Sequence, residues 1–256
     1  MKNAGLADTA AVILPEAAHR LHVFSSAGLT RHWRRPTIKQ AFDSGRQMTT
    51  TTHFSTKDRI LGAAEELFAQ FGFSGTSLRQ VTSRADVNIA AVNYHFGSKE
   101  NLINEVFRRR MDEMSARRLV GLHAALETGE CNLEAVLAAF VEPALALAQD
   151  RHGGGAFIRV IARAYAEKND SLRRFLSDQY GHVLREFAKA IAECVPSLGK
   201  ETLYWRLDFL SGALTYAMAD FGMIKRRAGS SEAAHRERAA RELIAFAAAG
   251  LKAETN

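Results

Sequence analysis

The sequence is poor in the features of secreted, disulfide-rich or membrane-spanning proteins. It contains only two cysteines, Cys131 and Cys194, in 256 residues. Their spacing matches no metal site and suggests no pairing. We therefore expect two buried, reduced thiols and a reducing, cytoplasmic compartment. The apolar piece at 10–14 is broken by Pro15, and it is too short for a secretory core or a membrane span.

Proline and catalytic signatures are equally scarce. Only four prolines interrupt long runs rich in Ala, Leu, Arg and Glu, a composition that favours an all-α fold. The sequence has no nucleophile elbow, no nucleotide-binding fingerprint and no supported Cys–His pair, so we expect neither an enzyme nor a cofactor. His95 has no second His, Cys or carboxylate at ligand spacing, which argues against a metal site.

The positive charge is concentrated in the first fifth of the chain. The formal net charge is +6, and residues 1–50 hold seven Lys/Arg against three Asp/Glu, which is +4 of that total. The rest of the chain is therefore close to neutral. Any affinity for nucleic acid has to come from locally placed donors rather than from a globally basic surface.

The stretch 56–102 predicts three short helices and the start of a fourth. In Thr56–Gly72, with Thr56 as N-cap and Gly72 as the stop, apolar residues recur at helical spacing: Ile60, Leu61, Ala64, Leu67, Phe68 and Phe71. Thr76 or Ser77 caps a second helix, and the three residues 86–88 turn the chain into a third helix at 89–96. Two short helices around a tight turn, the second with a polar exposed face, form the geometry that enters a DNA major groove.

The order of these residues resembles the N-terminal domain of the tetracycline-repressor (TetR) family of bacterial transcription regulators. Three parts carry the resemblance: Ile-Leu-x-Ala-Ala-x-x-Leu-Phe at 60–68, Gly-Phe-x-x-Thr-Ser at 72–77, and Asn-Tyr-His-Phe-Gly-Ser-Lys-Glu-x-Leu at 93–102. The sequence of residues 90–99 is most similar to that of the fatty-acid-responsive, PsrA-like branch of the family. Asp86 stands where the family usually has Gly, and Asp tolerates the positive φ of such a turn.

Pattern and resemblance together predict four parts of the chain. These are a leader at 1–53, a DNA-binding head at 54–114 with its helix-turn-helix at about 77–96, a helical body for ligand binding and dimerisation at 115–252, and a tail at 253–256. The leader shows no sustained amphipathic period, so it is a disordered arm, a mis-called start or a basic arm that touches DNA. The further helices are expected at 99–127, 133–149, 156–167, 171–195, 200–227 and 231–252.

Contacts to DNA divide into phosphate donors and base-reading groups. The candidate phosphate donors are Thr76, Ser77, Tyr94, His95 and Lys99. The candidate base readers are Arg79, Asn88, Ala91 and Asn93, while Ile89 and Ala90 allow the backbone to approach closely. Arg matches guanine, Asn matches adenine and an Ala methyl can touch thymine. The alternatives are a solvated surface for Arg79 and Asn93 and a packing role for Tyr94.

The resemblance implies that the body encloses a cavity for a small apolar effector. The candidate lining residues are the large apolar side chains of the body and of the helix that enters it: Phe107, Met111, Met114, Phe140, Phe157, Tyr165, Phe175, Trp205 and Phe209. Ordinary core packing is the alternative for each. Arg159, Arg163 and Arg206 are candidates for pairing with an acidic head group at the cavity mouth, with solvated surface as the alternative.

These features predict a ligand-responsive, sequence-specific DNA-binding regulator. We expect a homodimeric repressor that leaves a double-stranded operator when an effector such as a fatty acid or acyl-CoA binds. The dimer is expected to form through the helices at about 200–227 and 231–252, because the last helix is too apolar to remain uncovered. Burial of that helix within its own chain is the alternative to dimerisation. The alternative function is a DNA-binding interaction protein controlled by a protein partner without a small-molecule inducer.

Overall fold

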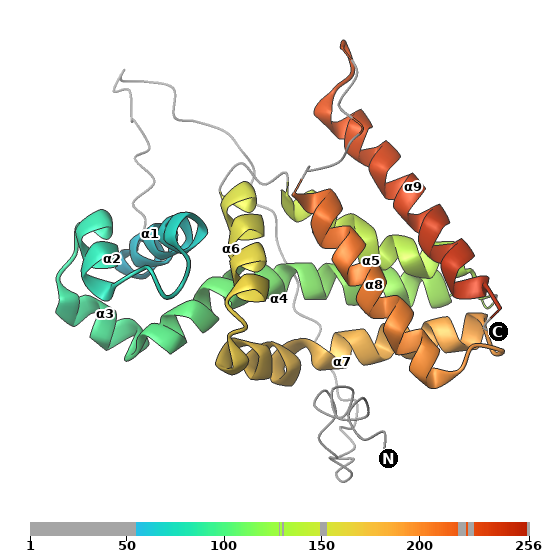
Figure 1. The fold of residues 1–256 in the computed structure, drawn as a ribbon, viewed down its shortest axis with the longest axis horizontal. Helices are drawn as coiled ribbons and strands as arrows, with labels where there is room; N and C mark the ends of the chain where they lie inside the picture. Colours follow the sequence, from blue (N-terminus) through green and yellow to red (C-terminus); the bar gives the residue numbers. More distant parts are fainter. Residues whose placement is uncertain are drawn as a thin grey trace, which may run out of the picture. The chain divides into compact units, whose positions relative to one another are not determined.

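The computed structural model describes residues 55–127, 129, 131–148, 153–219, 224 and 228–254. Contacts within the chain separate 1–53 from 54–256, and only the second unit contains described residues. The leader predicted at 1–53 therefore lies outside the described residues. Within the described part, all regular elements are α-helices, which confirms the predicted all-α class (Figure 1). None of the helices described has the length and apolarity needed to span a bilayer.

Three short helices form the first part of this unit: α1 (Thr56–Phe71), α2 (Leu78–Ala85) and α3 (Ile89–Phe96). Their fully buried side chains include Ile60, Phe68, Val81 and Val92. Helix α1 begins one residue earlier than predicted, because the N-cap is Ser55, whose Oγ accepts from the amide of Asp58 at 3.1 Å. Gly72 ends α1 with a φ of 75°, as the sequence predicted.

The turn between α2 and α3 is fixed both locally and from α1. Asp86 adopts the left-handed conformation, with φ 50° and ψ 57°, which confirms that Asp can take the position where Gly is usual. From α1, an Nη atom of Arg59 donates to the carbonyl oxygens of Ala85 and Asp86, each at 2.6 Å. The relative orientation of α2 and α3 is thus set partly by a side chain outside the turn.

Six further helices make up the rest of the described part: α4 (Lys99–Leu126), α5 (Leu133–Ala148), α6 (Gly154–Ala166), α7 (Asp170–Cys194), α8 (Lys200–Met218) and α9 (Glu232–Lys252). Helix α8 ends at Met218, earlier than the predicted 227, and most of residues 220–227 lie outside the described part. Helix α4 packs chiefly on α5 and α7, and α9 packs on α5. The main buried cluster lies among α4, α5, α7, α8 and α9, with Ile158 added from α6.

The expectation of two reduced, buried cysteines is wrong for this structure. Cys131 and Cys194 form a disulfide that joins the segment before α5 to the last residue of α7, with their Cα atoms 5.1 Å apart. Cys131 is exposed and Cys194 half-buried. The bond depends on where two distant helix ends meet, so the spacing of the two cysteines along the chain did not indicate it. It also removes the argument from cysteine usage for a reducing compartment.

Reduction of this bond should destabilise the protein. The disulfide closes a stretch of 63 residues, and its loss should lower the free energy of unfolding by about 2–4 kcal/mol. Denaturant unfolding with and without a thiol reductant measures the change. The Cys131→Ser/Cys194→Ser double variant should match the reduced protein and should not respond to reductant. An unchanged unfolding midpoint on reduction would contradict this expectation.

Candidate nucleic-acid interface and effector cavity

Helix α3 has one buried side and one open side. Val92 and Phe96 face the core, while five of the predicted DNA contacts are exposed: Ile89, Ala90, Asn93, Tyr94 and His95. Tyr94 is 86% exposed and touches the ring of His95 edge-on at 5.1 Å. An aromatic side chain this open is not a core residue, so the packing alternative does not describe Tyr94. The exposed face offers donors, acceptors and apolar atoms to a groove.

Several other predicted contacts combine exposure with a local structural task. Asn88 is the N-cap of α3, because its Oδ1 accepts from the amide of Ala90 at 2.9 Å. Ser77 caps α2 in a capping box with Gln80. Arg79 is exposed on α2, and Ala91 is half-buried on α3. The capping groups hold the two helix N-termini in place, and the exposure of Arg79 and of the open face of α3 is consistent with their predicted role as base readers.

Thr76 requires a correction, since its position does not suit a phosphate donor. The residue is 2% exposed, and its hydroxyl donates to the carbonyl oxygen of Gly72 at 2.8 Å. A side chain buried and occupied in this way cannot reach a phosphate without breaking the link between α1 and α2. Its role in the structure is to fasten that link.

Lys99 occupies the first residue of α4, half-buried behind the N-cap Ser98. The Oγ of Ser98 accepts from the amide of Asn101 at 3.1 Å. Free amides and the helix dipole attract an anion at this end of α4, and the Lys99 ammonium adds a full positive charge. The first turn of α4 is therefore a second place where a phosphate can bind, next to α3.

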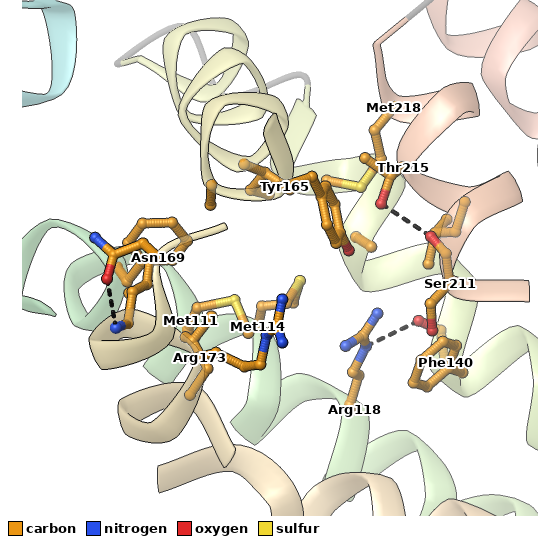
Figure 2. Close-up of a pocket in the computed structure, with 17 residues that line it drawn as sticks. Met111, Met114, Arg118, Phe140, Tyr165, Asn169, Arg173, Ser211, Thr215 and Met218 are labelled. Carbon is orange, nitrogen blue, oxygen red and sulfur yellow. Dashed lines mark hydrogen bonds between the residues drawn. The ribbon is translucent and has the colours of Figure 1, made fainter. Parts of the chain in front are cut away.

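A cavity of about 300 Å³ lies among α4, α5, α6, α7 and α8 (Figure 2). Five of the nine predicted lining residues border it: Phe107, Met111, Met114, Phe140 and Tyr165. The other four lie elsewhere. Phe157 is fully buried against Phe107, and Phe175 lies under the guanidinium of Arg108. Trp205 and Phe209 are 54% and 65% exposed on α8.

The polar part of the lining was not predicted from the sequence. It consists of Arg118, Asn169, Arg173, Ser211 and Thr215. None of the three arginines proposed for the cavity mouth borders the cavity: Arg159 is exposed, Arg163 donates to the carbonyl of Gln70, and Arg206 donates to the carbonyls of Leu251 and Ala253. Helical spacing carried a usable signal, since Arg118 follows Met111 and Met114 by seven and four residues on the same face of α4.

Two family profiles match this chain over more than half of its length. Residues 60–106 match the bacterial regulatory proteins of the tetR family, and residues 138–250 match the tetracyclin repressor-like C-terminal domain. The chain belongs to the TetR family. This is a family of transcription regulators, which confirms the prediction that the chain is not an enzyme.

Individual TetR-family relatives match over shorter stretches. The chain is 39% identical over 79 residues to the probable HTH-type transcriptional regulator YttP of Bacillus subtilis, covering 31% of this chain and 34% of that protein. It is 35% identical over 105 residues to the HTH-type transcriptional repressor Rv3405c of Mycobacterium tuberculosis, covering 41% and 44%. These matches thus span less than half the length of either relative.

A solved structure shares the fold. A putative tetR family transcription regulator from a Shewanella species superimposes with a TM-score of 0.54 at 21% identity, covering 77% of this chain and 96% of that one. At that identity the likeness concerns the TetR fold alone.

One carboxylate links the DNA-binding part of this TetR fold to the wall of the cavity. Glu167, which follows α6, accepts from the amides of Phe73 and Ser74 at 2.8 and 2.9 Å and from the Ser74 hydroxyl at 2.8 Å. A Cβ at Gly72 would overlap a carboxylate oxygen of Glu167, so the close approach needs glycine there. The preceding turn of α6 carries Tyr165 into the cavity lining. Any movement of α6 therefore reaches the link between α1 and α2.

The Glu167 contact should make part of the stability depend on pH. Burial raises the pKa of this carboxyl, but the hydrogen bonds from Ser74 and Phe73 outweigh it and bring the pKa below the ordinary 4.5. A lowered pKa means that the contribution is present above about pH 4.5 and is lost as the pH falls through the folded-state pKa. Glu167→Gln should cost about 1 kcal/mol at neutral pH, because water still reaches this carboxylate.

Denaturant unfolding of wild type and Glu167→Gln across a pH series measures this effect. The two stabilities should converge in acid. A difference that persists unchanged in acid would show that the charged carboxylate is not the stabilising group.

Two substitutions separate the DNA roles. Lys99→Ala should weaken binding to every duplex and lower the salt slope by about one unit, because it removes a phosphate contact.

Arg79→Ala should cost about 1–3 kcal/mol in the free energy of DNA binding and relax the preference at one base position. Lys189→Ala, an exposed lysine on α7, is the control for loss of charge. Titrations against a duplex selected from a random library measure the DNA affinity of all three variants. If Lys99→Ala and Arg79→Ala both bind DNA like wild type, the predicted placement of the helix-turn-helix on DNA is refuted.

Proposed function

We propose that the chain is a ligand-responsive, sequence-specific DNA-binding transcription regulator. The observation that carries the proposal is the exposed polar face of α3, in a helix-turn-helix that shares its fold unit with a lined cavity. The proposed regulator has a DNA-binding head at 54–114 and a body for ligand binding and dimerisation at 115–252, and it acts in the cytoplasm. The TetR-family membership supports the DNA-binding role, and the repressor name of the Mycobacterium relative supports repression.

The regulator acts as a homodimer through α8 and α9. Helix α8 exposes Trp205, Phe209 and Tyr216 at intervals of four and seven residues, and α9 exposes Phe246 at 71%. Aromatic side chains aligned in this way form a patch that a second copy can cover in a two-fold, four-helix interface. Helix α9 also buries Ala247, Ala248 and Leu251 within its own chain, which agrees with the alternative of burial in its own chain for these residues, while the exposed Phe246 supports the proposed dimerisation.

Effector binding in the cavity lowers the affinity for the operator. Met111 and Met114 border the cavity on the same helix that starts with Lys99. Lys99 and Met114 lie roughly 22 Å apart along α4 at the usual helical rise. The effector shifts the equilibrium only if it binds the DNA-incompetent arrangement of the two heads more tightly than the competent one. The resemblance to the PsrA-like branch favours a fatty acid or its CoA ester as this effector.

The alternative function is the same DNA-binding head controlled by a protein partner. A solid body would favour that alternative. A cavity of about 300 Å³ with polar groups in its lining favours the small molecule.

Filling the cavity should abolish the response to effector without abolishing DNA binding. Ala164 on α6 borders the cavity, whereas Ala162 on the same helix is exposed. In Ala164→Trp the new ring should occupy the space of the effector. Release from the operator should then require at least about tenfold more effector, which corresponds to a loss of about 1.4 kcal/mol in the free energy of effector binding. Ala162→Trp should respond like wild type.

Operator titrations with and without acyl compounds measure this response. If no acyl compound changes operator affinity in the wild type, the fatty-acid assignment fails. If no member of a broad panel of small molecules does, the protein-partner alternative replaces the proposal.

A further inference from the structure

A buried cation faces the cavity. Arg118 is only 9% exposed, and Figure 2 shows its side chain rising from α4 between Met114 and Phe140. Its Nε donates to the carbonyl oxygen of Phe140 at 2.9 Å, and its guanidinium carbon lies 3.9 Å from the centre of the Phe140 ring. Burial lowers the pKa of this guanidinium to about 10, so it is still charged at neutral pH.

No carboxylate compensates this charge within the described residues. Among the residues that the structure describes, the lining of the cavity contains neither Asp nor Glu, and the guanidinium of Arg118 makes a single hydrogen bond, the one from Nε. A guanidinium has five N–H donors in a planar fork, so the terminal amino groups are left for a ligand. A second arginine, Arg173 on α7, also borders the cavity but is far more exposed and pairs loosely with Asp170 at 3.8 Å.

Apart from the Tyr165 hydroxyl and the Asn169 amide nitrogen, the rest of the lining is apolar or already hydrogen-bonded. The hydroxyls of Ser211 and Thr215 donate to carbonyl oxygens of their own helix, each at 2.9 Å. Asn169 caps α7 through its Oδ1. Met111, Met114 and Leu214 supply apolar surface around these groups. A ligand that fits needs one anionic end for Arg118 and an apolar remainder.

The volume of the cavity, which is partly open to solvent, indicates how much of that ligand lies inside it. A water molecule takes up about 30 Å³ of liquid volume, so a cavity of about 300 Å³ holds on the order of ten atoms of that size. A medium-chain carboxylate matches this space. A CoA ester is several times larger, and its thioester has lost the carboxylate that a planar guanidinium fork binds with two parallel hydrogen bonds.

We propose that Arg118 is the receptor for the free carboxylate of a small amphipathic monoacid, whose apolar body occupies the cavity. This inference rests on the proposed effector site and narrows it from acyl compounds in general to the free acid of medium length. The burial of Arg118 strengthens the interaction, because an ion pair in a water-poor site is screened less than one at the surface. The carboxylate replaces the missing counter-charge, and Phe140 holds the fork in place.

Calorimetric titration of the purified full-length protein tests the proposal. The probes are decanoate, decan-1-ol and decanoyl-CoA. Decanoate should bind one site per chain, and decan-1-ol should bind about 10- to 100-fold more weakly because it lacks the charged hydrogen bonds. Decanoyl-CoA should bind no better than the alcohol.

The matched variants are Arg118→Met and Arg117→Met. Methionine keeps a flexible apolar side chain over Phe140, and Arg117 is the exposed neighbour that pairs with Glu113. Arg118→Met should bind decanoate about as weakly as decan-1-ol, while its unchanged affinity for the alcohol shows an intact cavity. Arg117→Met should keep the wild-type preference for the acid. Arg118→Lys, which keeps the charge without the fork, should fall between them.

Two results would overturn the proposal: a wild-type protein that does not bind decanoate, or an Arg118→Met variant that still prefers acid to alcohol as strongly as wild type. If Arg118→Met folds poorly, the comparison of acid and alcohol in the wild-type and Arg118→Lys proteins decides the matter. Operator titration with decanoate is a separate measurement. Acid binding that depends on Arg118 but leaves operator affinity unchanged would support the carboxylate site and refute the effector function.

Discussion

Helix α4 is the constraint on which the rest of the molecule depends, because it belongs to two buried clusters at once. Leu102 and Val106 are packed with α1, α2 and α3, whereas Met114 and Leu122 are packed with the helices around the cavity. Between them, the buried pair Arg110–Glu65, at 3.0 Å, ties the middle of α4 to α1. Breaking a buried charge pair is strongly destabilising, so this pair opposes a displacement of the middle of α4 relative to α1.

A second connection runs beside α4. Glu167 holds the link between α1 and α2 from the end of α6, and α6 contributes Tyr165 and Ala164 to the cavity. The cavity thus touches α4 and α6, and both of these helices contact the helices of the DNA-binding part. Sub-ångström changes in such packed elements become discrete rearrangements, since close-packed cores are not continuously deformable. In the proposed mechanism, an effector alters the position of α3 by moving one of these two helices against the other.

The sequence predicted the local features well, because they are encoded by neighbouring residues. The stop at Gly72, the cap at Ser77 and the left-handed Asp86 all follow from backbone and capping chemistry within a few positions. Features that depend on tertiary neighbours were harder to predict. Periodicity shows that Trp205 and Phe209 share a helix face, but it does not say whether that face meets a cavity or a second copy. The disulfide and the buried Arg118 depend in the same way on helices far apart in the sequence.

The boundary drawn at residue 114 also hides a dependence between the two parts. Phe157, Val160 and Leu172 belong to the buried cluster of α1–α3 although they come from α6 and α7. Phe157 continues a row of ring contacts that runs from Phe68 through Phe73 and Phe107. The DNA-reading unit is therefore not a detachable module. A chimera that exchanges DNA-binding heads between related regulators therefore has to carry the matching face of α6 with it. The same constraint applies to the exchange of such heads during evolution.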